Sequence, residues 1–343
     1  MLTPTHERLH RLPKAELHVH LDGSLRPRTL LQLAHTRGVA LPATDPAGLA
    51  RAMLATRTSS LEEYLESFRL TLAAMQDAEA IERIAFELGE DHAAEHVRYV
   101  EARFCPALCT EGGLSSDQVL DAALAGLARA HAATGILTNV IVCALRSLPP
   151  EVSLDMAELA VSYGDRGVCA FDLAGAEAGN PVRDHLDALR TAVGGGLPVT
   201  IHAGEGFGAE SIRQALELGH ARRIGHGTRL AEDPALLAEV RAAGVTLEIC
   251  LTSNVQTRVA ESYATHPLRC FFDQGVDVSL CTDNRLMSGV TLTQEYEHAR
   301  DALGFTWNEL VRIARSGFAS AFATPGIRDA LLRDFDDEAA RIG

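Results

Sequence analysis

Short apolar runs alternate regularly with longer amphipathic stretches along the 343 residues, and this alternation constrains the fold more than any other feature. Eight apolar runs suit buried strands, and they cover residues 15–21, 97–104, 137–145, 168–173, 198–202, 223–226, 246–251 and 276–281. The intervening residues 80–95, 116–133 and 234–243 space their apolar side chains as helices do. The alternation predicts an α/β fold built on a parallel sheet.

Eight strand–helix units predict a single (β/α)8 TIM barrel domain covering residues 1–343. The alternative is an open, doubly wound sheet, whose nucleotide-binding form carries GxGxxG after the first strand. Here Asp22-Gly23-Ser24-Leu25 follows the first strand instead, which favours the barrel. Extra residues at about 41–75 separate the first unit from the second, and we expect them to form a helical lid insertion beside the catalytic face.

Charge and composition exclude several partners and mechanisms. A formal net charge of −15 makes the chain a poor match for nucleic acid, and no apolar stretch is long enough to span a membrane. The N-terminal residues lack the apolar segment of a secretory signal, and the seven cysteines form no CxxC pair. We therefore expect a soluble, cytoplasmic protein. Lys14 is the only lysine, so a Schiff-base or P-loop lysine would have to be this residue.

Polar side chains gather where the predicted strands end. His18 and His20 lie two residues apart in the first strand, so they point to the same side. His202 ends the fifth strand, His226 ends the sixth, and Asp283 follows the eighth. In a barrel these ends meet at one face, and burying so many polar groups is costly without a shared ligand. Imidazole and carboxylate groups suit a metal such as Zn²⁺, so we expect a metal site at this face.

An ordered set of motifs resembles the adenosine deaminase family of amidohydrolase barrels. The motifs are LHVHLDGSL (17–25), FDLAGAE (171–177), IHAGE (201–205), RIGHG (223–227), LTSN (251–254) and SLCTDN (279–284). No single motif is decisive, but their order and spacing are together specific, and the resemblance runs from about residue 8 to about residue 335. It implies one zinc ion per chain and the hydrolytic release of ammonia from a purine nucleoside.

The resemblance implies four zinc ligands, namely His18, His20, His202 and Asp283. It also implies that a zinc-activated water attacks C6 of the purine. His226 would orient this nucleophile and stabilise charge during the attack, and Asp283 would accept the proton of the water. Glu205 would protonate purine N1, and for that role we expect burial to raise its pKa.

The resemblance further implies contacts to the substrate. His20 and Asp22 would lie beside it, with Asp22 at the position that binds the ribose hydroxyls, and Gly175 would offer its backbone N–H to purine N3. The residues that match a hydrophobic lid over the nucleoside are Leu61, Tyr64, Leu65 and Phe68. Their helical spacing is equally typical of a packed helix. Many relatives carry Asp where this chain has Asn284, and an amide can donate to purine N7 without titrating.

The leading hypothesis is deamination of adenosine, and of 2′-deoxyadenosine, to inosine and ammonia. A modified adenine nucleoside such as aminofutalosine is the first alternative, and free adenine is the second. A binuclear amidohydrolase commonly needs a carboxylated lysine on the fourth strand, where this chain has none. The HxE…PCxxC signature of cytidine deaminases is absent, and a non-catalytic nucleoside-binding protein would not need Glu205 and His226. The sequence leaves the oligomeric state open.

One further motif competes with this interpretation. His92-Ala93-Ala94-Glu95-His96 matches the HxxEH pattern of inverted zinc proteases. It falls at the end of the predicted helix before the second strand, which places it on the N-terminal side of the barrel. We therefore expect a polar helix face there and no peptidase site.

Overall fold

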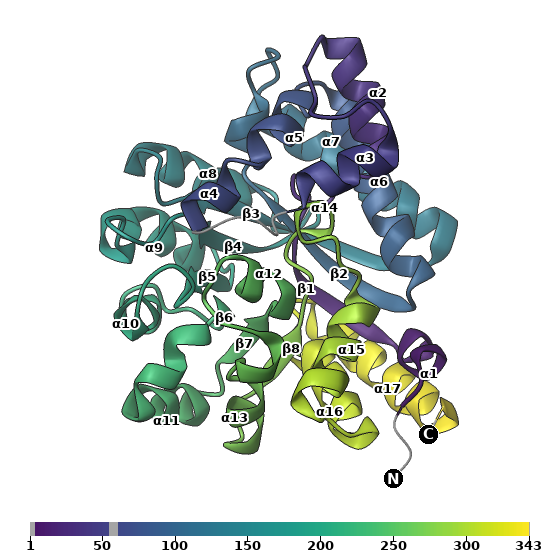
Figure 1. The fold of residues 1–343 in the computed structure, drawn as a ribbon. Coiled ribbons are helices and arrows are strands. Elements are labelled where there is room, and N and C mark those ends of the chain that lie inside the picture. The colour runs from purple at the N-terminus through teal and green to yellow at the C-terminus, as the bar shows by residue number, and fades with distance from the viewer. Residues whose placement is uncertain (1–3, 55–60, 343) are drawn as a thin grey trace.

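The computed structural model describes residues 4–54 and 61–342. Eight parallel strands of this part of the chain pair in chain order and confirm the predicted TIM barrel (Figure 1). The strands are β1 Lys14–His20, β2 Val97–Phe104, β3 Leu137–Leu145, β4 Val168–Ala174, β5 Val199–Ala203, β6 Arg223–His226, β7 Thr246–Ile249 and β8 Val278–Leu280. Because they run parallel, their C-terminal ends all reach the same mouth of the barrel.

The barrel closes where the first and last strands meet. Val19 of β1 pairs in parallel with Asp283, which follows β8. The backbone N–H of His20 donates to the Asp283 carbonyl over 2.7 Å, and the N–H of Asp283 donates to the His18 carbonyl over 2.9 Å. These two bonds bring together residues that the sequence analysis placed at separate strand ends.

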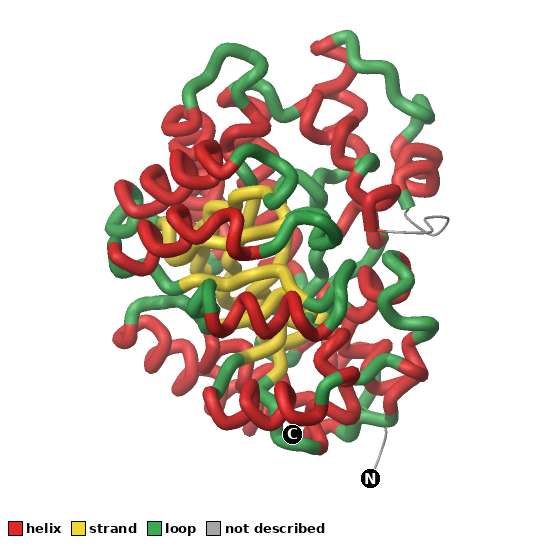
Figure 2. The backbone as a smooth tube through the Cα atoms, turned by 90° about the vertical axis from the view of Figure 1, so that its left-hand side faces the viewer, coloured by secondary structure: helices red, strands yellow, loops and turns green. Residues whose placement is uncertain are grey.

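Helices surround the strands, and Figure 2 shows the strands enclosed among them. The α-helices are α1 His6–Arg11, α2 Pro27–Arg37, α3 Pro46–Met53, α4 Leu61–Leu65, α5 Phe68–Ala74, α6 Ala78–Ala94, α7 Ser116–Thr134, α8 Pro150–Ser162, α9 Leu186–Gly194, α10 Ala209–Glu217, α11 Pro234–Ala243, α12 Leu251–Gln256, α13 Leu268–Asp273, α14 Arg285–Ser288, α15 Leu292–Leu303, α16 Trp307–Ser320 and α17 Pro325–Ile342. The 3₁₀ helices are η1 Pro106–Cys109, η2 Val182–His185, η3 Thr228–Glu232 and η4 Tyr263–Thr265.

Local capping signals set the starts of the three helices predicted from periodicity. Asp77 caps α6 by accepting the N–H of Ala80, and Ser115 forms a capping box with Gln118 at the start of α7. Asp233 accepts two backbone N–H groups at the start of α11. The observed helices therefore match the predicted segments to within two residues at each end.

The two last strands are shorter than predicted. β7 ends at Ile249 and not at residue 251, because Leu251 already begins α12. β8 begins at Val278 and not at residue 276, because the N–H of Val276 donates to the carbonyl of Phe271 at the end of α13. Apolar periodicity cannot separate a strand residue from a buried residue of the adjoining turn.

The predicted insertion lies between α2 and α6, and the structure describes α3, α4 and α5 within it, whereas residues 55–60 lie outside the described part. Helices α2, α3 and α5 stand together at the top of Figure 1. The hydroxyl of Tyr64 on α4 lies 3.2 Å from the hydroxyl of Ser288 on α14, which ties the insertion to the segment after β8. The role of the insertion as a lid stays a prediction.

The described helices include none that is long and apolar enough to cross a membrane. The seven cysteines all lie in the described part of the chain as free thiols, and Cys270 alone is exposed. Burial raises the pKa of Cys143 and of Cys250 well above the ordinary value, so these thiols stay protonated at neutral pH.

Lys14 opens β1 with its side chain fully buried. Its ammonium group donates to the backbone carbonyls of Leu9, His10 and Leu12 over 2.9, 3.0 and 2.7 Å. These carbonyls end α1, where helical partners are missing. Burial lowers the pKa of Lys14 to about 7. The only lysine therefore has a structural role that its sequence context did not reveal.

We predict that Lys14→Met lowers the free energy of unfolding by about 2–3 kcal/mol, because buried carbonyls lose their donor. Chemical denaturation followed by circular dichroism measures this change. Arg11→Met, an exposed change on the same helix, is the control and should alter stability by less than about 0.5 kcal/mol. Equal stability of Lys14→Met and the wild type would contradict the capping role.

Candidate active site and metal centre

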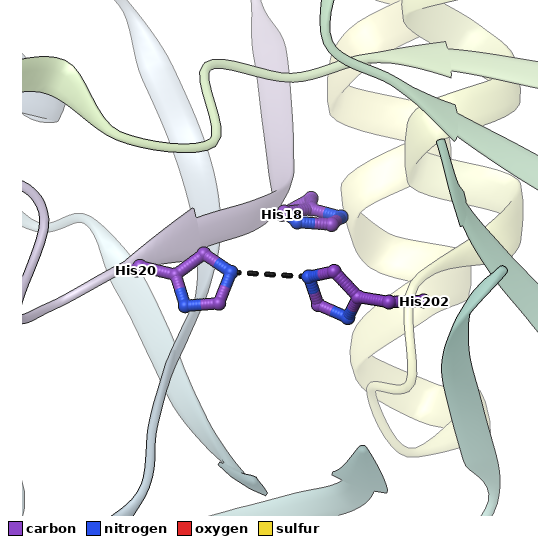
Figure 3. A group of neighbouring side chains, drawn as sticks. All are labelled: His18, His20 and His202. Atoms are coloured by element: carbon purple, nitrogen blue, oxygen red, sulfur yellow. Dashed lines mark hydrogen bonds between the residues drawn. The ribbon is translucent and has the colours of Figure 1, made fainter. Parts of the chain in front are cut away.

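Three imidazoles meet at the C-terminal mouth of the barrel (Figure 3). His18 and His20 come from β1 and His202 from β5. The Nε2 atoms of His20 and His202 lie 3.2 Å apart, and the rings of His18 and His202 have centroids 4.5 Å apart. The alternation of β1 explains why residues 18 and 20 both face this point, as the sequence pattern predicted.

Asp283 and His226 complete the cluster. Asp283 Oδ1 lies 3.5 Å from Nε2 of His18 and 3.4 Å from Nε2 of His20. Ligand atoms of His18, His226 and Asp283 lie within 4.8 Å of one another, as do those of the three histidines drawn in Figure 3. The described residues thus contain two overlapping groups that could hold a metal ion.

The chemistry of the cluster fits a metal ion. Nε2 of His18 is fully buried and has no hydrogen-bond partner, so a ligand at the centre of the cluster would satisfy it. Imidazole nitrogens with one carboxylate oxygen are a donor set that suits Zn²⁺.

Two carboxylates orient two of the imidazoles by contacting the ring nitrogen that faces away from the cluster. Glu248 Oε2 lies 2.9 Å from Nδ1 of His18, and Asp172 Oδ2 lies 3.0 Å from Nδ1 of His202. Arg103 links the carboxylates by donating to both, over 2.8 and 3.0 Å. Burial alone would raise the pKa of Asp172, but His202 and Arg103 lower it below the ordinary value. A carboxylate accepts from Nδ1–H, so the Nε2 lone pair of each ring faces the cluster.

Burial dominates the protonation of the remaining groups. It lowers the pKa of His20 and of His226 well below the ordinary value, so both rings are neutral near pH 7. Burial also raises the pKa of Asp22 to about 7, with a further contribution from the nearby charge of Asp283.

Two residues of the cluster have a left-handed backbone, which is uncommon for residues other than glycine. His226 has a φ of 64° and Asp283 a φ of 61°. Each lies at or just beyond a strand end, where the chain turns away from the barrel. Such strain persists only where the surrounding structure over-determines the conformation, and here it aims both side chains into the mouth.

A cavity of about 200 Å³ opens beside the cluster. All the residues predicted to contact the substrate line it, namely His20, Asp22, Leu61, Tyr64, Leu65, Phe68, Gly175 and Asn284, together with His202, Glu205, His226 and Asp283. His18 lies buried and is not part of this lining. Glu205 Oε2 is 3.5 Å from Nε2 of His226. Every predicted site residue except His18 therefore lines one cavity.

Comparison with known proteins gives the family. A family model described as "Adenosine deaminase" matches residues 13–338. The chain belongs to the adenosine deaminase family. It is 43% identical, over 353 aligned positions covering 97% of each chain, to an adenosine deaminase of Mycobacterium sp. (strain JLS). It is 40% identical, over 96% of this chain and 99% of the other, to an adenosine deaminase of Clostridium acetobutylicum.

A solved structure shares the fold. The adenine deaminase from Arthrobacter aurescens superimposes with a TM-score of 0.88 and 27% sequence identity, over 96% of this chain and 98% of that one. The two proteins therefore share the barrel fold along nearly the whole length of this chain.

The sequence analysis missed Glu177, whose carboxylate holds the turn after β5 in the HAGE motif (residues 202–205). Glu177 accepts the backbone N–H groups of residues 204, 205 and 206 over 2.9, 2.7 and 2.8 Å. Arg146 donates to the carbonyl of His202 over 2.6 Å. Glu177 ends the FDLAGAE motif, which was the available signal, but the motif does not reveal its contact with the turn after β5, 27 or more residues away.

The HxxEH segment does not form a second metal site among the described residues. His92 is fully buried, and its Nδ1 donates to the carbonyl of Leu88 over 2.8 Å. Glu95 forms an ion pair with Arg285 over 2.6 Å. His92 therefore packs inward and is not part of the polar helix face that we expected.

Glu248→Gln should weaken metal binding about 10- to 100-fold, because an amide cannot accept from His18 and from the neighbouring arginines at once. Titration of the metal-free protein against a competing chelator measures the dissociation constant. Glu101→Gln is the matched control: Glu101 belongs to the same buried charge network through Arg223 but contacts none of the cluster imidazoles. Equal metal affinity for both variants would contradict the orienting role of Glu248.

Proposed function

We propose that this chain is a zinc-dependent adenosine deaminase that hydrolyses adenosine, and 2′-deoxyadenosine, to inosine and ammonia. The observation that carries the proposal is the position of Glu205 and His226, which line the same cavity as the metal cluster and lie 3.5 Å apart. The names of the curated relatives, at 40–43% identity along nearly the whole chain, support the same activity.

His18, His20, His202 and Asp283 would hold one zinc ion. When bound, zinc lowers the pKa of a water molecule to near neutrality and so provides the nucleophile. The buried, unpartnered Nε2 of His18 supports this assignment. Glu248 and Asp172 support it too, because they leave Nε2 of two ligand imidazoles as acceptors towards the centre.

The remaining residues would supply proton transfer and orientation. Glu205 protonates purine N1 as the ring loses aromaticity, and the predicted rise of its pKa stays a prediction. Asp283 accepts the proton of the attacking water, and His226 orients its oxygen. Gly175, with a φ of 91°, brings its backbone close to the purine, where its N–H would meet N3.

Asp22 favours a nucleoside over free adenine. Its carboxylate is buried at the wall of the cavity, and its Oδ1 has no hydrogen-bond partner in the protein. Ribose hydroxyls, which free adenine lacks, would donate to this oxygen. A modified adenine nucleoside remains the alternative substrate, and the apolar residues Leu61, Leu65 and Phe68 would cover either ligand.

An ammonia-release assay with the zinc-loaded protein tests the substrate. We expect turnover of adenosine and 2′-deoxyadenosine to exceed that of adenine and of 5′-extended adenine nucleosides. Glu205→Gln should keep one zinc equivalent per chain while kcat falls about 10²- to 10⁴-fold, because the amide cannot protonate N1. Fast turnover of a 5′-extended nucleoside alone would show that this nucleoside, and not adenosine, is the substrate. A near wild-type rate for Glu205→Gln would show that another residue is the proton donor.

Asn284 generates a separate prediction about pH. Its side chain faces the cavity and lies so close to Gly23 that a Cβ there would collide with the amide. Asn284→Asp should retain activity, but its KM should rise as pH rises through the pKa of the new carboxyl, because only the protonated acid donates to purine N7. Steady-state kinetics from pH 5 to 9 check this, and a pH profile of KM identical to that of the wild type would exclude Asn284 as the N7 donor.

A further inference from the structure

A chain of buried hydrogen bonds runs from the backbone of α13 to His226. It begins at Leu268, whose N–H donates to Nδ1 of His266 over 3.1 Å. A backbone N–H is always a donor, so Nδ1 of His266 is an acceptor and carries no proton. His266 is therefore neutral and carries its proton on Nε2. Burial also lowers its pKa to about 3, consistent with a neutral ring.

The next link is Asn254 on α12. Nε2 of His266 lies 3.1 Å from Asn254 Oδ1, and the hydroxyl of Thr228 donates to the same oxygen over 3.1 Å. The opposite amide orientation would point the NH₂ group at the N–H of His266, donor against donor. The protonation of His266 thus decides which end of the Asn254 amide faces His226.

The last link reaches the active site. Nδ2 of Asn254 lies 3.0 Å from Nδ1 of His226, so the amide donates and Nδ1 accepts. A neutral ring that accepts at Nδ1 carries its proton on Nε2. Nε2 is the atom that lies 3.5 Å from Glu205, and it faces the mouth of the barrel. Asn254, His226 and His266 are each at most 3% exposed, so water does not compete for these bonds.

We propose that Asn254 and His266 are positioning residues that hold His226 as the Nε2-protonated tautomer. Within the proposed deaminase reaction, on which this inference rests, His226 then donates a hydrogen bond to the attacking oxygen and does not act as its base. The proton of the water goes to a carboxylate, for which Asp283 is placed. The backbone N–H of Leu268, which does not line the cavity, thus fixes the tautomer of His226 through His266 and Asn254.

The experiment compares the zinc-loaded wild type with Asn254→Asp, which has almost the same shape but only accepts. The carboxylate should force a proton onto Nδ1 of His226. Nitrogen-15 spectra of histidine-labelled protein report the tautomer, with His226→Gln assigning the signal among 14 histidines. We expect Nδ1 of His226 to be unprotonated in the wild type and protonated in Asn254→Asp. We also expect kcat to fall about 10²-fold or more with zinc content unchanged.

Two substitutions of His266 test the proposal independently if Asn254→Asp fails to fold. His266→Gln places an amide N–H close to the lost Nε2–H and should preserve the tautomer and a kcat within about threefold of the wild type. His266→Phe supplies no donor, so we expect mixed tautomers at His226 and a kcat about 10-fold lower.

Two results would overturn the inference. One is an unprotonated Nε2 on His226 in the wild type, and the other is an unchanged tautomer and rate in Asn254→Asp or in His266→Phe. A wild type that does not deaminate adenosine would instead contradict the proposed function, because the tautomer spectrum is read without any substrate.

Discussion

The two backbone hydrogen bonds that close the barrel are the constraint on which the site depends. They join His18 and His20 of β1 to Asp283 beyond β8, over 2.9 and 2.7 Å. Three of the four proposed ligands are therefore fixed by the same contact that completes the sheet. The contact that completes the sheet thus also places Asp283 beside the two histidines of β1. The left-handed backbone of Asp283 is the local strain that accompanies this arrangement.

The interior of the barrel is unusual because it holds a network of buried charges beneath the cluster of histidines and Asp283. Arg103 and Arg223 are at most 1% exposed, as are Glu101, Asp172 and Glu248, and hydrogen bonds join them. Burying such charges is costly, and apolar side chains of similar volume often stabilise a fold at least as well. What apolar side chains cannot do is orient an imidazole. The network leads to Nδ1 of His18 and of His202, where its carboxylates fix the orientation of both rings.

Three histidines of the site make a hydrogen bond through Nδ1, the ring nitrogen that faces away from the centre of the cluster. His18 and His202 contact carboxylates at Nδ1, whereas His226 contacts an amide that donates to Nδ1. The first arrangement leaves a lone pair on Nε2 and suits a metal ligand; the second leaves a proton on Nε2 and suits a donor to oxygen. In the proposed reaction histidine would thus serve two kinds of chemistry, and the side chain that contacts Nδ1 of each ring would distinguish them.

The sequence by itself determined the class of fold and predicted which polar residues would meet at the mouth of the barrel. Apolar periodicity depends on residues a few positions apart, and this was enough for all eight strands and for helices α6, α7 and α11. The polar residues at the strand ends then had to meet, because parallel strands end at one mouth. Only the tertiary structure decided the partners of those residues. Glu177, Glu248 and Asn254 act across the barrel, and the sense of each hydrogen bond depends on distances between segments that no sequence spacing encodes.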